Sequence, residues 1–285
     1  VDLYLVNHPE LVKEVLNQTH RKFDKQPVFY DRFRNALGNG LVNSEGEHWK
    51  RQRKLLQPVF SSSSERTFFD VMLNTAEEKV TRWERLANAG TLFQLQDGFA
   101  ALTLDIAGKP LFSDAFADSA DDIRRWTRTI NTYSSIPPNR VLNNMRFPSY
   151  LNLRLRRTLR EYEAFLKEMI SARIEHPSEG DLLSVLLAMR DEETGEPMSL
   201  ADVADEVLGM IIGGHETASV ALTWTLFELQ RHPEIEKRVI AEIDRVVAHD
   251  PIDFDGLSEL PLTKQVLDAP SPTGLVRESE CERRH

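Results

Sequence analysis

Residues 213–217, which read Gly-Gly-His-Glu-Thr, are the segment of this chain best suited to proton-transfer chemistry. A carboxylate beside a hydroxyl, here Glu216 and Thr217, can pass protons between water and a reacting group. The flanking residues 208–212 and 220–227 are largely apolar, so we expect a helix that is apolar on most faces and buried. A carboxylate in such a place is costly unless it is paired, hydrated or protonated, and perturbed groups of this kind gather at functional sites.

The two glycines of this segment support the same interpretation. Each glycine inside a helix costs about 1 kcal/mol relative to alanine. A sequence accepts that cost where another group must approach the backbone closely or where the helix must distort. Gly213 and Gly214, next to an acid and an alcohol, therefore predict a water-fed site of proton delivery.

Two other hypotheses stay open for this segment. In the first, Gly213 and Gly214 only allow close helix packing, and Glu216 pairs with a buried arginine. In the second, His215 and Glu216 begin a zinc-hydrolase motif. That motif needs a second histidine one turn later, where this chain has Ser219, so we predict no metal ligand here.

One long helix is expected to carry the segment. Ser199 is a candidate N-cap with Asp202 as its capping-box partner, and an uninterrupted pattern follows as far as residue 231. About 32 residues at 1.5 Å each give a helix of roughly 48 Å. A polar loop at residues 191–197 precedes it.

Helical patterns dominate the remaining sequence. A short strand is expected at residues 1–6, a loop at 38–44, and a last helix that opens at 260 and is stopped by prolines 270 and 272. In the helix at 234–247 we expect an inward stripe of Ile235, Val239, Ile240 and Ile243. The other expected helices lie at 46–58, 65–88, 98–108, 119–135, 150–175 and 181–190.

Composition narrows the class of protein. The chain has 285 residues with a formal charge of −10, which argues against a general nucleic-acid binder because phosphate binding needs clustered positive charge. Its one cysteine, Cys281, excludes an intrachain disulfide. No apolar run reaches the ~18–20 residues of a membrane span, and no signal peptide is visible. We therefore expect a cytoplasmic protein.

Trp49 and Arg53 form a second candidate site, in the helix expected at 46–58. Residues four apart project from one face of a helix. An indole N–H and a guanidinium both suit a carboxylate partner. The spacing by itself is equally typical of a solvated basic face with one packed tryptophan.

Together, these segments resemble the cytochrome P450 family, the haem-thiolate monooxygenases. Residues 213–217 resemble its oxygen-binding motif, Ala/Gly-Gly-x-Asp/Glu-Thr, although the following residue, often Thr or Ser in the family, is Ala218. Residues 47–60 resemble its Trp-x-x-x-Arg helix. Shorter agreements at 6–12, 230–234 and 260–268 extend the resemblance, in order, over residues 1–268.

The resemblance implies a fold and a cofactor. The fold is mostly α, the N-terminal and central part of the P450 fold, with a long central helix and little β. The cofactor is haem b, with the acid and the alcohol relaying protons to bound dioxygen. The residues implied are Gly213, Gly214, Glu216 and Thr217 on the distal face and Trp49, Arg53 and, as a weaker candidate, His48 at the propionates.

The resemblance also implies a reaction and partners. The reaction is hydroxylation of an apolar small molecule, with NAD(P)H electrons delivered by a ferredoxin- or flavin-type donor. Lys50, Arg51 and Lys54 would lie near the face where that donor docks, or are ordinary solvated charges. Substrate contacts would come from variable loops such as residues 26–37.

The resemblance stops after residue 268. The family continues with Glu-x-x-Arg, where this chain has Ala269 and Pro272, and the Cys-containing iron-ligand loop is absent. Cys281 lies among acidic residues that disfavour a thiolate. We therefore expect a partial, truncated P450 domain at 1–268 and a disordered charged tail at 269–285. The chain itself would be inactive, and the alternative is a non-catalytic remnant with no enzymatic role.

Overall fold

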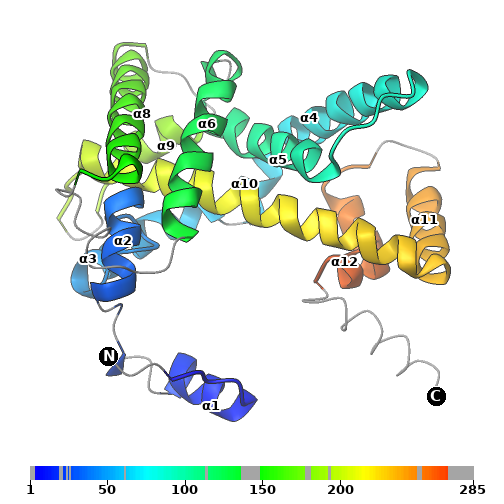
Figure 1. Ribbon diagram of the computed structural model, residues 1–285, viewed down its shortest axis with the longest axis horizontal. Helices are drawn as coiled ribbons and strands as arrows, with labels where there is room; N and C mark the ends of the chain where they lie inside the picture. The colour runs from blue at the N-terminus through cyan, green and yellow to red at the C-terminus, as the bar shows by residue number, and fades with distance from the viewer. Residues whose placement is uncertain are drawn as a thin grey trace. The chain divides into compact units, whose positions relative to one another are not determined.

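The computed structural model describes residues 4–18, 22–23, 25, 27–60, 62–112, 115–135, 148–176, 181–191, 194–248 and 252–268. The described chain is built from helices and contains no strand, which confirms the mostly α prediction (Figure 1). The expected tail, with Cys281, lies outside these residues. In chain order the α-helices are α1 (Pro9–Lys13), α2 (Pro27–Leu37), α3 (Gly46–Leu56), α4 (Ser62–Asn88), α5 (Leu95–Phe112), α6 (Ala115–Ser135), α8 (Tyr150–Glu175), α9 (Leu182–Ala188), α10 (Leu200–Arg231), α11 (Pro233–Val247) and α12 (Pro261–Asp268).

The strand expected at residues 1–6 is wrong over its described part. Residues 4–6 have no regular structure, and Tyr4 is 83% exposed. An extended segment becomes a strand only when a neighbouring strand binds its backbone N–H and C=O groups. The described residues supply no such neighbour, since their one β-bridge joins Arg190 to Pro197.

Residues 26–37, predicted as a variable loop, mostly form the helix α2 instead. Pro27 is its first residue, where the fixed φ of proline and its missing N–H suit a helix start. Gly38 ends it, with φ of +68° and its N–H bound to Arg34 O at 3.0 Å. Ala36 and Leu37 are buried, so packing of the last turn adds to these local signals.

The chain divides into two compact units. Unit 1 comprises residues 1–56, 125–174 and 187–209, and so contains α2, α3, α8 and the first turns of α10. At its core, the indole of Trp126 packs against the rings of Tyr162 and Phe165 at 5.9 and 5.5 Å between centroids. Its fully buried aliphatic side chains include Ile130, Leu155, Leu166, Val203 and Val207.

Unit 2 comprises residues 57–124, 175–186 and 210–285, and contains α4, α5, α9, α11, α12 and the larger part of α10. Trp83 stacks on Phe93 and meets Phe99 edge-on, which joins α4 to α5. A second cluster joins the end of α10 to α11 and α12. Its buried members are Leu229, Val239 and Val266, with Ile235, Ile243 and Leu262 packed against them.

The predicted inward stripe of α11 is right at three positions and wrong at Ile240, which is half exposed. Ile235, Val239 and Ile243 are spaced four apart and so share one face. Ile240 follows Val239 directly and is turned about 100° away from that face.

The long helix α10 has the predicted length of 32 residues. Ser199 caps it as expected: its Oγ accepts the Asp202 N–H at 3.1 Å, and its hydroxyl donates to Asp202 Oδ2 at 2.7 Å. The helix therefore begins where the sequence placed it. Among the described residues, no helix has the length and apolarity needed to cross a membrane.

Candidate active site

Segment 213–217 lies near the middle of α10, on the part that belongs to unit 2. One face of this stretch is buried and the other is open. The buried residues, spaced four apart, are Ile211, His215 and Ser219. The exposed residues are Gly213, Gly214, Glu216 and Thr217. The expectation of burial on most faces is thus wrong here, because neighbouring helices pack against only one side.

The glycine pair opens the backbone on the exposed side. A Cβ built on Gly213 would meet nothing within 4 Å, and one on Gly214 would meet only Ala107 Cβ, at 3.7 Å. Gly213 therefore has no packing neighbour, whereas Gly214 faces Ala107 of α5 at ordinary contact distance, so the packing hypothesis applies only to Gly214. Glu216 is exposed, so the buried setting that the same hypothesis assumes for its carboxylate is absent.

The hydroxyl of Thr217 bonds to its own helix. Its Oγ1 donates to Gly213 O at 2.7 Å, which places the hydroxyl beside the bare glycine backbone. The Thr217 Oγ1 atom still has lone pairs that can accept a hydrogen bond from water. The carboxylate and the hydroxyl are thus adjacent on a face that water reaches, as proton relay requires.

A residue that the sequence analysis missed, Thr103 of α5, bonds to this segment from the buried side. Its Oγ1 lies 2.7 Å from His215 O and 2.9 Å from Phe99 O. A threonine inside the apolar run of the helix predicted at 98–108 was the available signal, since a buried hydroxyl needs a partner. The partner itself could not be read from the sequence.

His215 is held inward and uncharged. Burial lowers the pKa of its imidazole, although the hydrogen bond with Ile211 O, 3.1 Å from Nδ1, opposes that shift. In the part of the chain that the structure describes, no group of three or more His, Cys, Asp or Glu side chains could hold a metal ion. Neither observation supports the zinc hypothesis.

The second candidate site lies on α3, in unit 1. Trp49 and Arg53 are both exposed, while Gln52 and Leu56 of the same helix are buried. Neither the Trp49 indole nor the Arg53 guanidinium has a hydrogen-bond or ion-pair partner among the described residues. Both donors are therefore available to a carboxylate.

The other ionisable residues of α3 have partners. His48 Nε2 lies 3.3 Å from Asn39 O and 3.7 Å from Asp202 Oδ1, so this side chain faces the protein. Lys50 pairs with Glu47 at 2.6 Å, and Arg51 pairs with Asp191 at 3.0 Å.

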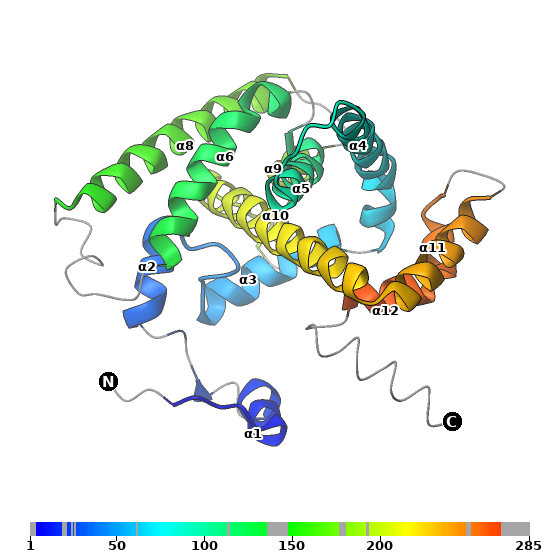
Figure 2. The same ribbon diagram turned by 45° about the vertical axis from the view of Figure 1, so that its right-hand side comes forward.

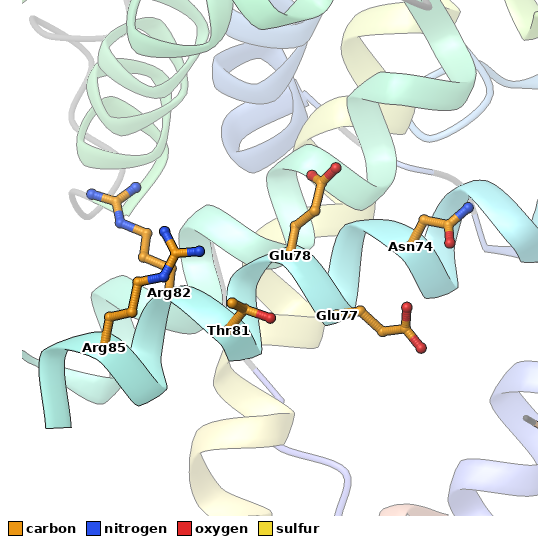
Figure 3. Close-up of a pocket in the computed structure, with 6 residues that line it drawn as sticks. All are labelled: Asn74, Glu77, Glu78, Thr81, Arg82 and Arg85. Carbon is orange, nitrogen blue, oxygen red and sulfur yellow. The ribbon is translucent and has the colours of Figure 1, made fainter. Parts of the chain in front are cut away.

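A surface depression of about 630 Å³ on α4 includes no residue of either candidate site. Figure 3 shows that its lining side chains all project from α4, with carboxylates toward one end and guanidiniums at the other. The lining residues are Asn74, Glu77, Glu78, Thr81, Arg82 and Arg85. A charged, one-sided depression does not suit an apolar ligand.

Comparison with known proteins decides the family. The sequence model of the family described as "Cytochrome P450" matches residues 2–268. The chain belongs to the cytochrome P450 family. Among P450 relatives, it is 32% identical to a pentalenene oxygenase of Streptomyces avermitilis, an alignment that covers 93% of this chain and 58% of the relative. It is also 32% identical to a cyclooctat-9-en-7-ol 5-monooxygenase of Streptomyces melanosporofaciens, with 93% and 57% covered.

Solved P450 structures agree in fold. The haem domain of cytochrome P450DA superposes with a TM-score of 0.76 at 28% identity, covering 92% of this chain and 58% of that one. Retinoic acid-bound cyanobacterial CYP120A1 gives 0.76 at 24% identity, a likeness of fold alone. The chain thus spans somewhat less than three-fifths of the length of the P450 proteins it matches.

Haem is the cofactor that the P450 family implies, and each candidate site, taken by itself, suits one part of it. The open backbone at Gly213 leaves room for a flat group against α10. The unpartnered donors of Trp49 and Arg53 suit its carboxylates. The one cysteine of the sequence, Cys281, lies outside the described residues.

Proposed function

We propose that residues 1–268 supply the oxygen-activation side of a haem-thiolate monooxygenase. The observation that carries this proposal is the match of the P450 family to residues 2–268, within which the acid–alcohol pair lies on an open face of α10. Haem with an axial thiolate, when bound, supplies oxygen binding and the electron density that favours O–O cleavage. The chain's own residues supply orientation and protons.

The proton path is assigned to Glu216 and Thr217. Glu216 is exposed and can exchange protons with bulk water. The Thr217 Oγ1 atom can accept a hydrogen bond from an ordered water while its own O–H donates to Gly213 O. Gly213 and Gly214 keep the backbone bare at that point. Losing the hydroxyl would leave water at this position without its anchor.

Trp49 and Arg53 are assigned to the haem propionates. A charge-assisted hydrogen bond to a carboxylate is worth about 1.5–3 kcal/mol. His48 stays a weaker candidate, because its Nε2 already lies 3.3 Å from Asn39 O and a propionate would have to displace that contact.

An apolar substrate and a flavin-type donor follow from the names of relatives. Two relatives are named for pentalenene and for cyclooctat-9-en-7-ol. A third, from Gibberella moniliformis and 29% identical, is named a bifunctional cytochrome P450/NADPH–P450 reductase; the alignment covers 92% of this chain and 24% of that protein. We infer hydroxylation of an apolar small molecule with electrons from NAD(P)H through a flavin- or ferredoxin-type partner.

We further propose that the 285-residue chain alone does not perform this reaction. Past residue 268 its sequence has neither the Glu-x-x-Arg helix nor the iron-ligand loop of the family. Carbon monoxide binding to the reduced haem complex tests this, because a thiolate ligand gives a red-shifted Soret band. The chain alone should lack the band, and a hybrid of residues 1–268 with an intact family C-terminal segment should show it.

The two results separate the hypotheses. A band in the unmodified chain at full haem occupancy would refute the inactivity proposal, and Cys281→Ser would then show whether that thiol is the ligand. A hybrid that folds but takes up no haem would refute the monooxygenase proposal and favour a non-catalytic remnant.

A further inference from the structure

The loop at residues 38–44, between α2 and α3, is bound by two consecutive carboxylates of α10. Asn39 N donates to Asp205 Oδ2 at 2.7 Å, and Leu41 N donates to Glu206 Oε1 at 2.8 Å. The bonded residues are 166 and 165 positions apart in the sequence. Loop and carboxylates belong to unit 1, and Figure 2 shows α2 and α3 beside the first turns of α10.

Two glycines make this approach possible. Gly38 has φ of +68°, and a Cβ there would collide with the Asp205 carboxylate. A Cβ on Gly40 would lie 3.1 Å from the carbonyl carbon and oxygen of Asp205. Only residues without a side chain let the loop backbone approach α10 this closely.

The carbonyl groups of the same loop face cations. Lys25 Nζ donates to Val42 O at 2.6 Å and to Ser44 O at 3.2 Å. Arg34 Nε donates to Asn43 O at 3.2 Å. The loop is therefore held from two sides, by acids at its N–H groups and by bases at its C=O groups.

Glu206 is the unusual member of this arrangement. It is 3% exposed, and no basic side chain in the described structure forms an ion pair with it. Its own helix adds the like charges of Asp202 and Asp205. Burial, reinforced by those charges and opposed by the Leu41 N–H, raises the pKa of Glu206 to about 7.

The elements packed around this cluster carry few compensating charges. From α3, His48 Nε2 lies 3.7 Å from Asp202 Oδ1. From α8, Glu163 adds a further negative charge near Asp205, and the buried Tyr162 hydroxyl has no hydrogen-bond partner in the described structure. Burial raises the pKa of Asp205 as well, against the Asn39 hydrogen bond.

We propose that loop 38–44 and Glu206 form a proton-linked latch, closed on α10 when Glu206 is protonated and released when it ionises. The Leu41 N–H can still bond to the carbonyl oxygen of the neutral acid, while protonation removes the repulsion among three carboxylates. Because the loop leads directly into α3, the latch controls how firmly the start of that helix is held. The latch does not depend on bound haem.

The direction in which pH changes the closure of the latch follows from the linkage between closure and proton binding. In the released state the carboxyl returns toward its ordinary pKa of about 4.3. The closed state binds the proton more tightly, so closure is fully favoured below that ordinary pKa. The preference is lost as pH rises through about 7, the folded-state pKa of Glu206.

Amide hydrogen exchange of the full haem-free chain tests the latch. The protection of the Asn39 and Leu41 amides, corrected for the intrinsic effect of pH, should fall about tenfold or more between pH 5.5 and 8.5. In Glu206→Gln the side chain cannot ionise, so protection should stay at its low-pH level throughout. Glu168→Gln, which neutralises an exposed carboxylate of α8 in the same unit, should keep the wild-type profile.

Three results would overturn the latch. One is a Glu206→Gln variant whose amide protection falls with pH as it does in the unmodified chain. Another is a loop whose two amides show no protection, or constant protection, across the pH range. The third is a parallel loss at the buried α8 residue Leu166, because the unit would then be unfolding as a whole.

Discussion

Thr217 and Arg53 differ in what their side chains already bind in this chain. Thr217 Oγ1 donates to Gly213 O at 2.7 Å, so its hydroxyl is fixed before any ligand arrives. The Arg53 guanidinium is exposed and has no partner among the described residues. The first residue is placed to order water and the second to hold an anion, so their loss should cause different failures.

Thr217→Ala should uncouple turnover in a hybrid that carries an intact family C-terminal segment. NAD(P)H consumption should continue while product yield falls and peroxide rises, because the water that delivers protons loses its anchor. Product and peroxide are measured per NAD(P)H consumed. The matched control is Thr225→Ala on the same helix, whose hydroxyl makes an equivalent bond to Ala221 O at 2.9 Å. Unchanged yields in Thr217→Ala would refute the proton-relay role.

Arg53→Ala should weaken haem retention in the same hybrid without uncoupling it. Loss of one charge-assisted bond of about 1.5–3 kcal/mol corresponds to roughly 10- to 150-fold in haem affinity. Transfer of haem to an excess of an apo-acceptor protein measures it. Arg51→Ala, which loses the exposed pair with Asp191, is the control and should retain haem normally. Equal haem loss in both variants would contradict the propionate role.

At the scale of elements, the helices begin and end on local signals, but their attachment to one another depends on distant residues. The short helix α12 is an example. The Glu242 carboxylate of α11 accepts Leu262 N at 2.9 Å, Thr263 N at 2.8 Å and the Thr263 hydroxyl at 2.7 Å. It thereby satisfies N–H groups of the first turn of α12 that lack intrahelical partners.

Glu242→Ala should therefore detach the start of α12 from α11. Burial alone would raise the pKa of Glu242, but these hydrogen bonds outweigh it and lower the pKa. A lowered folded-state pKa means that the stabilisation is present above the ordinary pKa of glutamate and is lost as pH falls through the folded value. At neutral pH, the amides of Leu262 and Thr263 should exchange faster in Glu242→Ala than in the unmodified chain. In the unmodified chain, exchange of the same amides, corrected for the intrinsic effect of pH, should become faster as the pH is lowered into the acid range. Asp244→Ala, which removes an exposed carboxylate of the same helix, should leave hydrogen exchange at Leu262 and Thr263 unchanged. An equal rise in Asp244→Ala would contradict the capping role of Glu242.

At the scale of the whole molecule, the second half of α10 leaves large apolar side chains in water. Trp224 is 54% exposed and packs edge-on to Phe227, which is also exposed. Val220 and Leu226 add to the same exposed stretch, while Leu222 is half-buried. At about 25 cal/mol per Å² of apolar area, a few such side chains cost several kcal/mol, comparable to the net stability of a domain.

We therefore expect the haem-free chain to aggregate through this exposed stretch of α10, while the packed helices elsewhere keep their tertiary contacts. It should bind a hydrophobic dye and associate further as its concentration rises, while keeping its helical far-ultraviolet circular dichroism. Trp224→Ser with Phe227→Ser should reduce dye binding, whereas Leu92→Ser, at an exposed loop residue of unit 2, should not. A sharp cooperative melt of monomer without haem would contradict this expectation.

The sequence by itself determined what depends on neighbours along the chain. The cap at Ser199, the 32 residues of α10, and the spacing of Trp49 to Arg53 and of Gly213 to Thr217 are local features. Local patterns of this kind follow from hydrogen bonds and side-chain spacing within a few residues. They were sufficient to place most of the helices and to indicate the family. At α2, the local signals of Pro27 and Gly38 were present but were not recognised as a helix.

Only the tertiary structure decided which faces are covered and which distant groups meet. It turned Glu216 and Ile240 outward, placed Thr103 on His215 O, and brought loop 38–44 onto Asp205 and Glu206 across more than 160 residues. Helical periodicity gives the direction of a side chain relative to its own axis, but burial depends on which other helices pack there. For that reason a carboxylate expected to be buried, Glu216, is exposed, while Glu206, which the sequence did not distinguish, is enclosed.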